Sequence, residues 1–275
     1  MDAISRAGSI DAASESDEFG DDEPLDEPVE GEDDELETIA DAAFELLAER
    51  QEIVGAAYPF SVDGSLLTAD DGAVTSPYSF LAALTHFGPL FDGTLEGSSL
   101  FERLSAAALV EYLGGPASVR SFNFGFPRPE TLRSFRQAID DLCEKMGEGG
   151  GDAGRMKASD MKDAGLDLAA WVPFGDGRLN QLSVFGQCAA GQNWRSKITE
   201  LQPSHFCRSW MLDPPALSPL AAFFVPRQIG EPNWEIDARH ERQILFDRLR
   251  IARLLGDLDE ELAERCASWT AAAIG

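Results

Sequence analysis

The first 37 residues set where the folded part of this chain begins. They contain sixteen Asp or Glu residues, and Arg6 is their only basic residue. A segment like this has too few apolar groups to offset the entropy lost on ordering, and its like charges repel one another. We therefore predict a disordered acidic tail over residues 1–37 and a folded domain over residues 38–275.

The charge of the chain is divided unevenly between these two parts. The tail holds −15 of the formal charge of −27, which leaves −12 on the other 238 residues. The folded part is thus acidic, and it has no strongly basic footprint for nucleic acid. The tail itself is either a solubilising segment or a functional segment that occludes a basic site, and the sequence leaves both open.

Composition limits the class of protein. A chain of 275 residues, 44% of them hydrophobic, is long enough to bury a sizeable core. No apolar run approaches the ~20 residues of a membrane span, and no apolar signal-peptide core is present. The four cysteines form no CxxC pair, which argues against a disulfide scaffold. We expect a cytoplasmic protein that does not associate with a membrane.

Hydrophobic periodicity predicts helices and strands in alternation. Residues 78–87 are compatible with a helix or a buried strand. Residues 55–77 indicate loops or short strands, and residues 147–151 indicate a loop. Helices are predicted at 37–53, 99–113, 132–146, 194–201, 237–255 and 258–273, and strands at 119–126, 166–172, 182–188 and 220–225. This order predicts an α/β (α+β) fold with a core over about residues 99–225 and a C-terminal helical part over 236–274.

Three short motifs do not support the chemistry that they suggest. Residues 186–193 have the glycine spacing of a phosphate loop, but Gln-Asn stands where Lys-Ser/Thr is required. Ser159-x-x-Lys162 lacks the partner motifs of a serine acyl-enzyme, and His205-x-Cys207 lacks a second pair of zinc ligands. A Ser-His-Asp triad is equally unsupported, because no GxSxG motif is present.

One set of residues has the composition of a metal-dependent phosphodiesterase site. Glu102 lies on a predicted helix, Asp167 at the head of a predicted strand, Gln187 at the end of the next strand, and Lys197 shortly after it. A hard divalent cation prefers oxygen ligands, and the ends of paired strands lie close enough to share one ion. A nearby ammonium group then orients or polarises the attacking water.

These residues carry a resemblance to a known family. Residues 162–171 (KDAGLDLAAW), 184–189 (VFGQCA) and 194–197 resemble the PD-(D/E)xK restriction-endonuclease-like superfamily, as a divergent member. In that family an acidic residue follows a Gly-hydrophobic pair at the head of a hairpin strand, the position of Asp167. A Glu or Gln follows on the next strand, the position of Gln187, and an upstream helix often adds the Glu that Glu102 matches.

The resemblance covers about residues 99–200 and implies a central mixed β-sheet flanked by helices. It also implies that Asp167, Gln187 and Glu102 bind Mg²⁺ or Mn²⁺, and that these three act in catalysis together with Lys197. One position departs from the pattern, because Ala189 stands where the family has its lysine. Lys197 is the better substitute and Lys162 the weaker one.

Some basic and aromatic residues are candidates for contact with nucleic acid. These are Arg128, Arg133, Arg195 and Trp194. Arginines can hold phosphates without reading sequence, and a tryptophan can stack on a base. The alternatives are that the arginines pair with carboxylates of this chain and that Trp194 closes the core.

The resemblance implies a metal-dependent nuclease that hydrolyses phosphodiester bonds, in DNA by preference, within a microbial antiviral defence system. Because the folded part is acidic, we expect DNA engagement to need a protein partner such as a helicase or ATPase subunit. The alternatives are a non-catalytic interaction subunit with a degenerate nuclease fold and an acidic inhibitor that mimics DNA. The sequence does not separate DNA from RNA, or a monomer from a homo-oligomer.

Overall fold

The computed structural model describes residues 32–125, 134–155, 164–230, 233–235, 237, 242–256 and 258–275, with side chains from Glu35 onward. The α-helices are α1 (Glu32–Val54), α2 (Pro77–Phe87), α3 (Glu96–Tyr112), α4 (Phe135–Met146), α5 (Pro203–Trp210), α7 (Arg248–Leu254) and α8 (Glu260–Ile274). Short 3₁₀ helices are η1 (Gly55–Ala57), η2 (Ala73–Thr75) and η4 (Trp194–Ser196). The strands are β1 (Phe60–Asp63), β2 (Leu66–Ala69), β3 (Arg120–Asn123), β4 (Gly149–Asp152), β5 (Leu168–Val172), β6 (Leu182–Cys188), β7 (Met211–Asp213), β8 (Leu220–Phe224) and β9 (Ile244–Phe246).

A five-stranded mixed sheet forms the centre of the molecule. Its strand order is β3-β5-β6-β8-β9. The first three strands pair antiparallel, and β6, β8 and β9 run parallel to one another. This confirms the predicted α/β class with a central mixed sheet.

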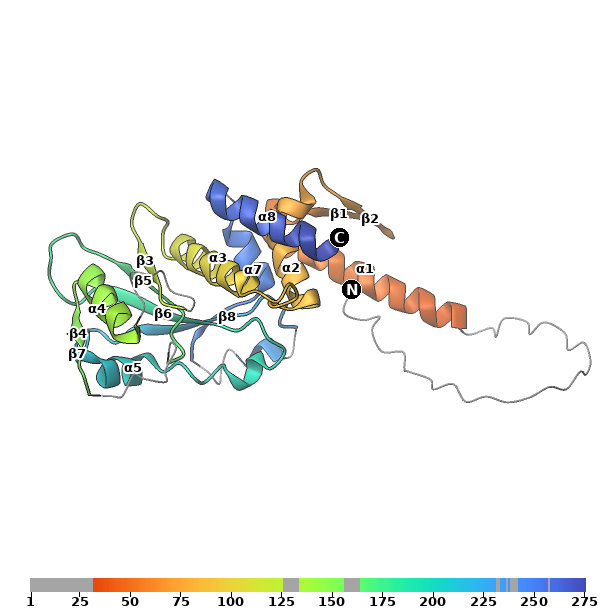
Figure 1. Ribbon diagram of the computed structural model, residues 1–275. Coiled ribbons are helices and arrows are strands. Elements are labelled where there is room, and N and C mark those ends of the chain that lie inside the picture. The colour runs from red at the N-terminus through yellow and green to blue at the C-terminus, as the bar shows by residue number, and fades with distance from the viewer. Residues whose placement is uncertain are drawn as a thin grey trace, which may run out of the picture.

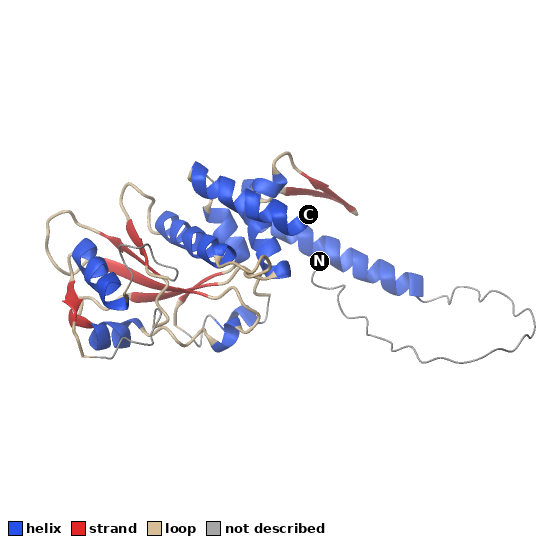
Figure 2. Ribbon diagram, viewed as in Figure 1, coloured by secondary structure: helices blue, strands red, loops and turns tan. Residues whose placement is uncertain are grey.

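Helices cover both faces of this sheet (Figure 2). Leu168 and Ala170 of β5 pack against α2, α3, α7 and α8 on one face. Ala169 and Trp171 pack against α4 and α5 on the other face. Because both faces are buried, the strand is apolar at every position instead of alternating, and this made it easy to recognise in the sequence.

Local signals set the ends of several helices, and the glycine stop after α3 was predicted. Gly114 and Gly115 follow Leu113, the C-cap of α3, and both have positive φ angles. A capping box formed by Ser134 and Gln137 begins α4. The ambiguous segment 78–87 is helical, with Ser76 as the N-cap of α2 and Pro77 at its first position.

Three predicted segments differ in the structure. The expected loop at 147–151 includes β4, which pairs antiparallel with β7. The helix expected over 237–255 is replaced, in its described part, by strand β9 and the shorter helix α7. The helix expected over 194–201 is reduced to the single 3₁₀ turn η4. In the first two cases the strand is formed by pairing with another segment, and local periodicity does not report such pairing.

The N-terminal boundary also differs from the prediction. Residues 1–31 lie outside the described residues, but α1 begins at Glu32, so residues 32–37 are helical instead of disordered. Figure 1 shows α1 projecting from the body of the molecule, with its C-terminal end near α7 and the β1–β2 hairpin. None of the helices in the described residues is long and apolar enough to cross a membrane. All four cysteines are free thiols, as the sequence predicted.

Candidate functional site

Helix α3 brings Glu102 to the edge of the sheet. The helix packs against β3, β5 and β6. The Glu102 carboxylate fills the space beside Gly125, where a Cβ atom would overlap both of its oxygens. The Glu102 carboxylate can therefore occupy this position only because residue 125 has no side chain.

The backbone of Asp167 is fixed by three hydrogen bonds. Its N–H donates to the Gly186 carbonyl over 3.0 Å, and its carbonyl accepts from the N–H groups of Phe124 and Gly125 over 2.7 and 2.9 Å. The side chain is buried, with the residue 8% exposed, and its Oδ2 accepts the Cys188 N–H over 2.7 Å. A buried carboxylate needs such donors, because an uncompensated charge is costly away from water.

The antiparallel register places Gln187 beside Asp167. Leu168 of β5 pairs with Gly186 of β6, so the start of one strand meets the end of the other. The Gln187 Nε2 donates to Glu200 Oε2 over 2.9 Å, and its Oε1 accepts the Leu201 N–H over 3.3 Å. The buried amide thus ties the segment after η4 to the end of β6.

The side chains of these elements meet in one cleft of about 360 Å³. Its chemically active lining consists of Glu102, Asp167, Gln187, Cys188, Lys197 and Glu200. The structure therefore brings together all four residues that the sequence singled out. They come from a helix, two strand ends and the segment that follows η4.

The pKa of the Cys188 thiol is raised by burial and by the carboxylates of this cleft. Burial raises its pKa well above the ordinary value, and the nearby charges of Asp167 and Glu102 raise it further. At neutral pH the thiol is protonated and adds no further negative charge.

The sequence analysis missed two members of the chemically active lining of the cleft, Cys188 and Glu200, and Glu200 is the charged one. It is an exposed residue on an irregular segment, and no periodic pattern marks it. The only sequence signal is its position three residues after Lys197. Its carboxylate accepts a hydrogen bond from the neutral Gln187 amide.

Ala189 does not line the cleft. It is 2% exposed and packs in an apolar cluster with Trp194, Ile198 and Phe223. Lys197 lines the cleft instead, on the segment directly after η4. Ala189 is therefore part of the apolar core, whereas Lys197 is part of the cleft lining.

The donor set of the cleft fits a hard cation held through few protein ligands. Within the residues that the structure describes, no three His, Cys, Asp or Glu side chains lie close enough together to hold a metal. The carboxylates of Asp167, Glu102 and Glu200 are nevertheless oxygen donors of the type that Mg²⁺ or Mn²⁺ prefers. Mg²⁺ commonly takes one or two carboxylates and keeps several waters. The Gln187 amide is engaged by residues 200 and 201, which makes Gln187 a less suitable ligand than the sequence suggested.

Trp194 and Arg195, the two described residues among those expected to contact nucleic acid, do not line this cleft. Trp194 is 5% exposed and lies 6.3 Å from Phe223 between ring centroids, so it closes the core. The Arg195 guanidinium covers the Trp194 ring and lies 3.7 Å from the Asp237 carboxylate. Trp194 therefore packs in the core and Arg195 pairs with a carboxylate of the chain, which were the alternatives to contact with nucleic acid. Arg128, Arg133 and Lys162 lie outside the described residues.

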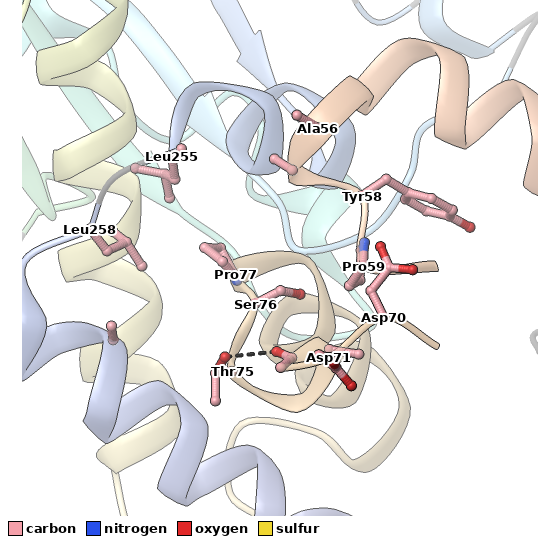
Figure 3. A pocket seen from close by; sticks show the side chains of 15 residues that line it. Ala56, Tyr58, Pro59, Asp70, Asp71, Thr75, Ser76, Pro77, Leu255 and Leu258 are labelled. Atoms are coloured by element: carbon pink, nitrogen blue, oxygen red, sulfur yellow. Dashed lines mark hydrogen bonds between the residues drawn. The ribbon is translucent and has the colours of Figure 1, made fainter. Parts of the chain in front are cut away.

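A second cavity, of about 450 Å³, lies between η1, the η2 turn and the segment linking α7 to α8 (Figure 3). Small and backbone groups form most of its wall, and Thr75 donates to the Gly72 carbonyl. Asp70 accepts a hydrogen bond from Ser61 at the surface. The lining of this cavity contains neither a lysine nor a buried carboxylate. It therefore offers fewer groups for acid–base or metal chemistry than the smaller cleft.

Searches with protein-family models, among curated proteins and among solved structures find no match to this chain. The assignment of the cleft therefore depends on its geometry and chemistry alone.

Proposed function

We propose that this chain is a metal-dependent phosphodiesterase that cuts nucleic acid, with DNA as the first substrate to test. One observation carries the proposal: Glu102, Asp167, Gln187 and Lys197 line a single cleft, although Glu102 is 65 residues before Asp167 in the sequence. The proposal extends to a restriction-endonuclease-like core and to a setting in microbial antiviral defence.

The order of the elements supports this finer fold assignment. Helix α3 with Glu102 comes first, followed by the antiparallel strands β3, β5 and β6. Asp167 precedes β5, and Gln187 is near the end of β6 at the same edge. A helix with an acidic residue followed by a hairpin with two polar strand-end residues is the arrangement that the resemblance implies.

The hydrolysis adds water across a phosphodiester bond. The water oxygen bonds to phosphorus, the bond from phosphorus to the leaving sugar oxygen breaks, and that oxygen takes up a proton. A bound Mg²⁺ or Mn²⁺ would supply positive charge beside the phosphate and stabilise the charge of the transition state. Asp167 and Glu102 would hold the ion, and water molecules would complete its coordination.

Lys197 would act on the attacking water. It is half-buried in the wall of the cleft, where an ammonium group can donate a hydrogen bond to a water next to the phosphate. It is the one lysine or arginine among the described residues of the cleft lining, so it also offsets part of the charge of three carboxylates. Gln187 would position Glu200 through its hydrogen bond.

A second candidate function is a non-catalytic subunit that keeps the fold. It is favoured by the lack of a preassembled group of three metal-binding side chains in the described part of the chain. In that case the cleft would be a remnant, and its residues would contribute to folding only.

Plasmid cleavage with Mg²⁺ or Mn²⁺ separates the two candidates. We expect the intact chain to nick or linearise the plasmid and EDTA to abolish this activity. Asp167→Asn keeps an oxygen that can accept the Cys188 N–H but removes the charge, and Lys197→Gln removes the ammonium group. Each substitution should reduce the rate by about 100-fold or more.

Matched substitutions outside the cleft control for folding and net charge. Asp213→Asn on β7 and Lys145→Gln on α4 change the same residue types away from the cleft lining. They should retain the activity of the unchanged chain. Activity that survives Asp167→Asn would contradict the assignment of the site, and inactivity of every form with both metals would favour the non-catalytic subunit.

A further inference from the structure

Helix α1 presents an apolar stripe to solvent. Leu36, Ile39, Ala43 and Leu46 follow one another at spacings of three and four residues, which places them on one face of the helix. Leu36, Ile39 and Leu46 are 64%, 50% and 49% exposed. We call these four residues the α1 stripe. Aliphatic side chains in a continuous row on one face are the pattern by which helices pack against other helices.

The α1 stripe continues a face that is buried further along the same helix. Val54 lies eighteen residues, or five helical turns, after Leu36, and it is buried against Leu249 and Ala252 of α7. The helix contacts α7 and β1, and Figure 1 shows its N-terminal part projecting beyond them. A partner on the stripe would therefore extend an existing helix–helix contact into solvent.

The charge around the stripe identifies the kind of partner. Glu35, Glu37, Asp41, Glu45 and Glu49 occupy the same stretch, which has no basic residue before Arg50. A second copy of α1 would bring like charges together, and an anionic lipid surface would be repelled. We propose that the α1 stripe docks a basic amphipathic helix of a partner protein, with apolar contacts at its centre and Lys or Arg side chains opposite the α1 carboxylates.

This docking surface is remote from the cleft, because no residue of α1 lines it. The proposal thus stands whether or not the chain cuts DNA. Its affinity would come mainly from burying the exposed Leu and Ile side chains. The charges would contribute to orientation and association rate more than to affinity.

Three synthetic peptides can test the surface with the full-length chain. The first is a helical peptide with Leu at the a and d heptad positions and Lys at e and g, the second has Glu in place of Lys, and the third has the composition of the first in scrambled order. The scrambled peptide measures non-specific attraction to the acidic residues of the chain. Fluorescence anisotropy of the labelled peptides gives the affinities, and circular dichroism checks the fold of each variant.

We expect the basic amphipathic peptide to bind at least tenfold more tightly than either of the other peptides. The combined substitution Leu36→Gln, Ile39→Gln and Leu46→Gln should reduce this binding at least tenfold. Leu66→Gln on β2 is the matched control, because Leu66 is 61% exposed but lies outside α1, and it should bind as the unchanged chain does. Equal binding of the basic and scrambled peptides, or binding that survives the triple substitution, would overturn the proposal. Dimerisation of the unliganded chain that the triple substitution abolishes would also overturn it, in favour of a second copy.

Discussion

The Glu102 carboxylate occupies the space that a side chain at residue 125 would need. A Cβ atom on residue 125 would overlap the Glu102 carboxylate, while the Gly125 N–H donates to the Asp167 carbonyl. We therefore predict that Gly125→Ala displaces the Glu102 carboxylate and lowers cleavage about tenfold or more, with a loss of stability of about 1–3 kcal/mol. Cleavage assays and urea denaturation measure the two effects.

Gly230→Ala provides the comparison for this substitution. A Cβ atom there meets no atom within 4 Å. The variant should keep both activity and stability, because glycine to alanine costs nothing where the space is open and φ is ordinary. If Gly125→Ala were as active as Gly230→Ala, the Glu102 carboxylate would not matter for the reaction.

At the scale of single residues, the sequence revealed the parts of the cleft that lie on regular elements. Asp167 was recognisable because a carboxylate at the head of an apolar strand is costly to bury without a purpose. Glu200 was not recognisable, because it reaches the cleft from an irregular segment that the Gln187 amide holds in place. Trp194 had two open alternatives, and its burial with Phe223 decided between them.

At the scale of elements, Asp247 joins the sheet to helix α7. Its Oδ1 accepts the Arg250 N–H as the N-cap of α7, and its Oδ2 accepts the Ile229 N–H over 3.3 Å. Burial raises the pKa of this carboxyl above its ordinary value of 3.8, although the two N–H donors and the charges of Arg250 and Arg248 lower it in part. The raised pKa means that the ionised form of Asp247 is less favourable in the folded state than in the unfolded chain.

This raised pKa predicts a pH dependence of stability. Between the ordinary pKa of the unfolded chain and the raised pKa of the folded chain, the folded state binds more protons, so stability falls as pH rises through this window. Asp247→Asn cannot ionise, and its free energy of unfolding should lack this decline. Urea denaturation of both proteins from pH 4 upward measures the difference. Asp259→Asn, at the exposed N-cap of α8, gives the cost of replacing a capping carboxylate alone. A parallel pH dependence for the unchanged chain and Asp247→Asn would contradict the prediction.

Strands that form only by pairing with another segment could not be predicted from local sequence patterns. Strand β9 has only three residues and is a strand because it pairs with β8, while β4 consists of three glycines and an aspartate that pair with β7. Local propensity argues against a strand at Gly149–Gly151. By contrast, α3 and α4 carry their own stop and start signals, and the sequence located them within a few residues.

At the scale of the whole molecule, negative charge limits how the chain can meet DNA. The residues after the first 37 carry −12, and three of the four charged side chains that line the cleft are carboxylates. Duplex DNA is itself a dense row of negative charge, and affinity for it comes largely from Lys and Arg contacts to phosphate. If this cleft cuts phosphodiester bonds as proposed, the isolated chain would meet DNA weakly, and a partner that brings the strand to the cleft would raise the rate of cleavage.

We therefore predict that the isolated full-length chain binds duplex DNA no more tightly than about 1 μM at roughly 0.15 M salt, the range of non-specific binding. Anisotropy of a labelled duplex with Asp167→Asn, which should not cut it, measures this affinity. Glu37→Gln, Glu45→Gln and Glu49→Gln together should raise the affinity if long-range repulsion is the cause, since all three carboxylates are exposed on α1. Nanomolar binding by the chain alone would remove the need for a DNA-recruiting partner such as a helicase or ATPase subunit. Weak binding combined with measurable cleavage would mean that such a partner supplies the phosphate contacts and this chain supplies the acids and the lysine.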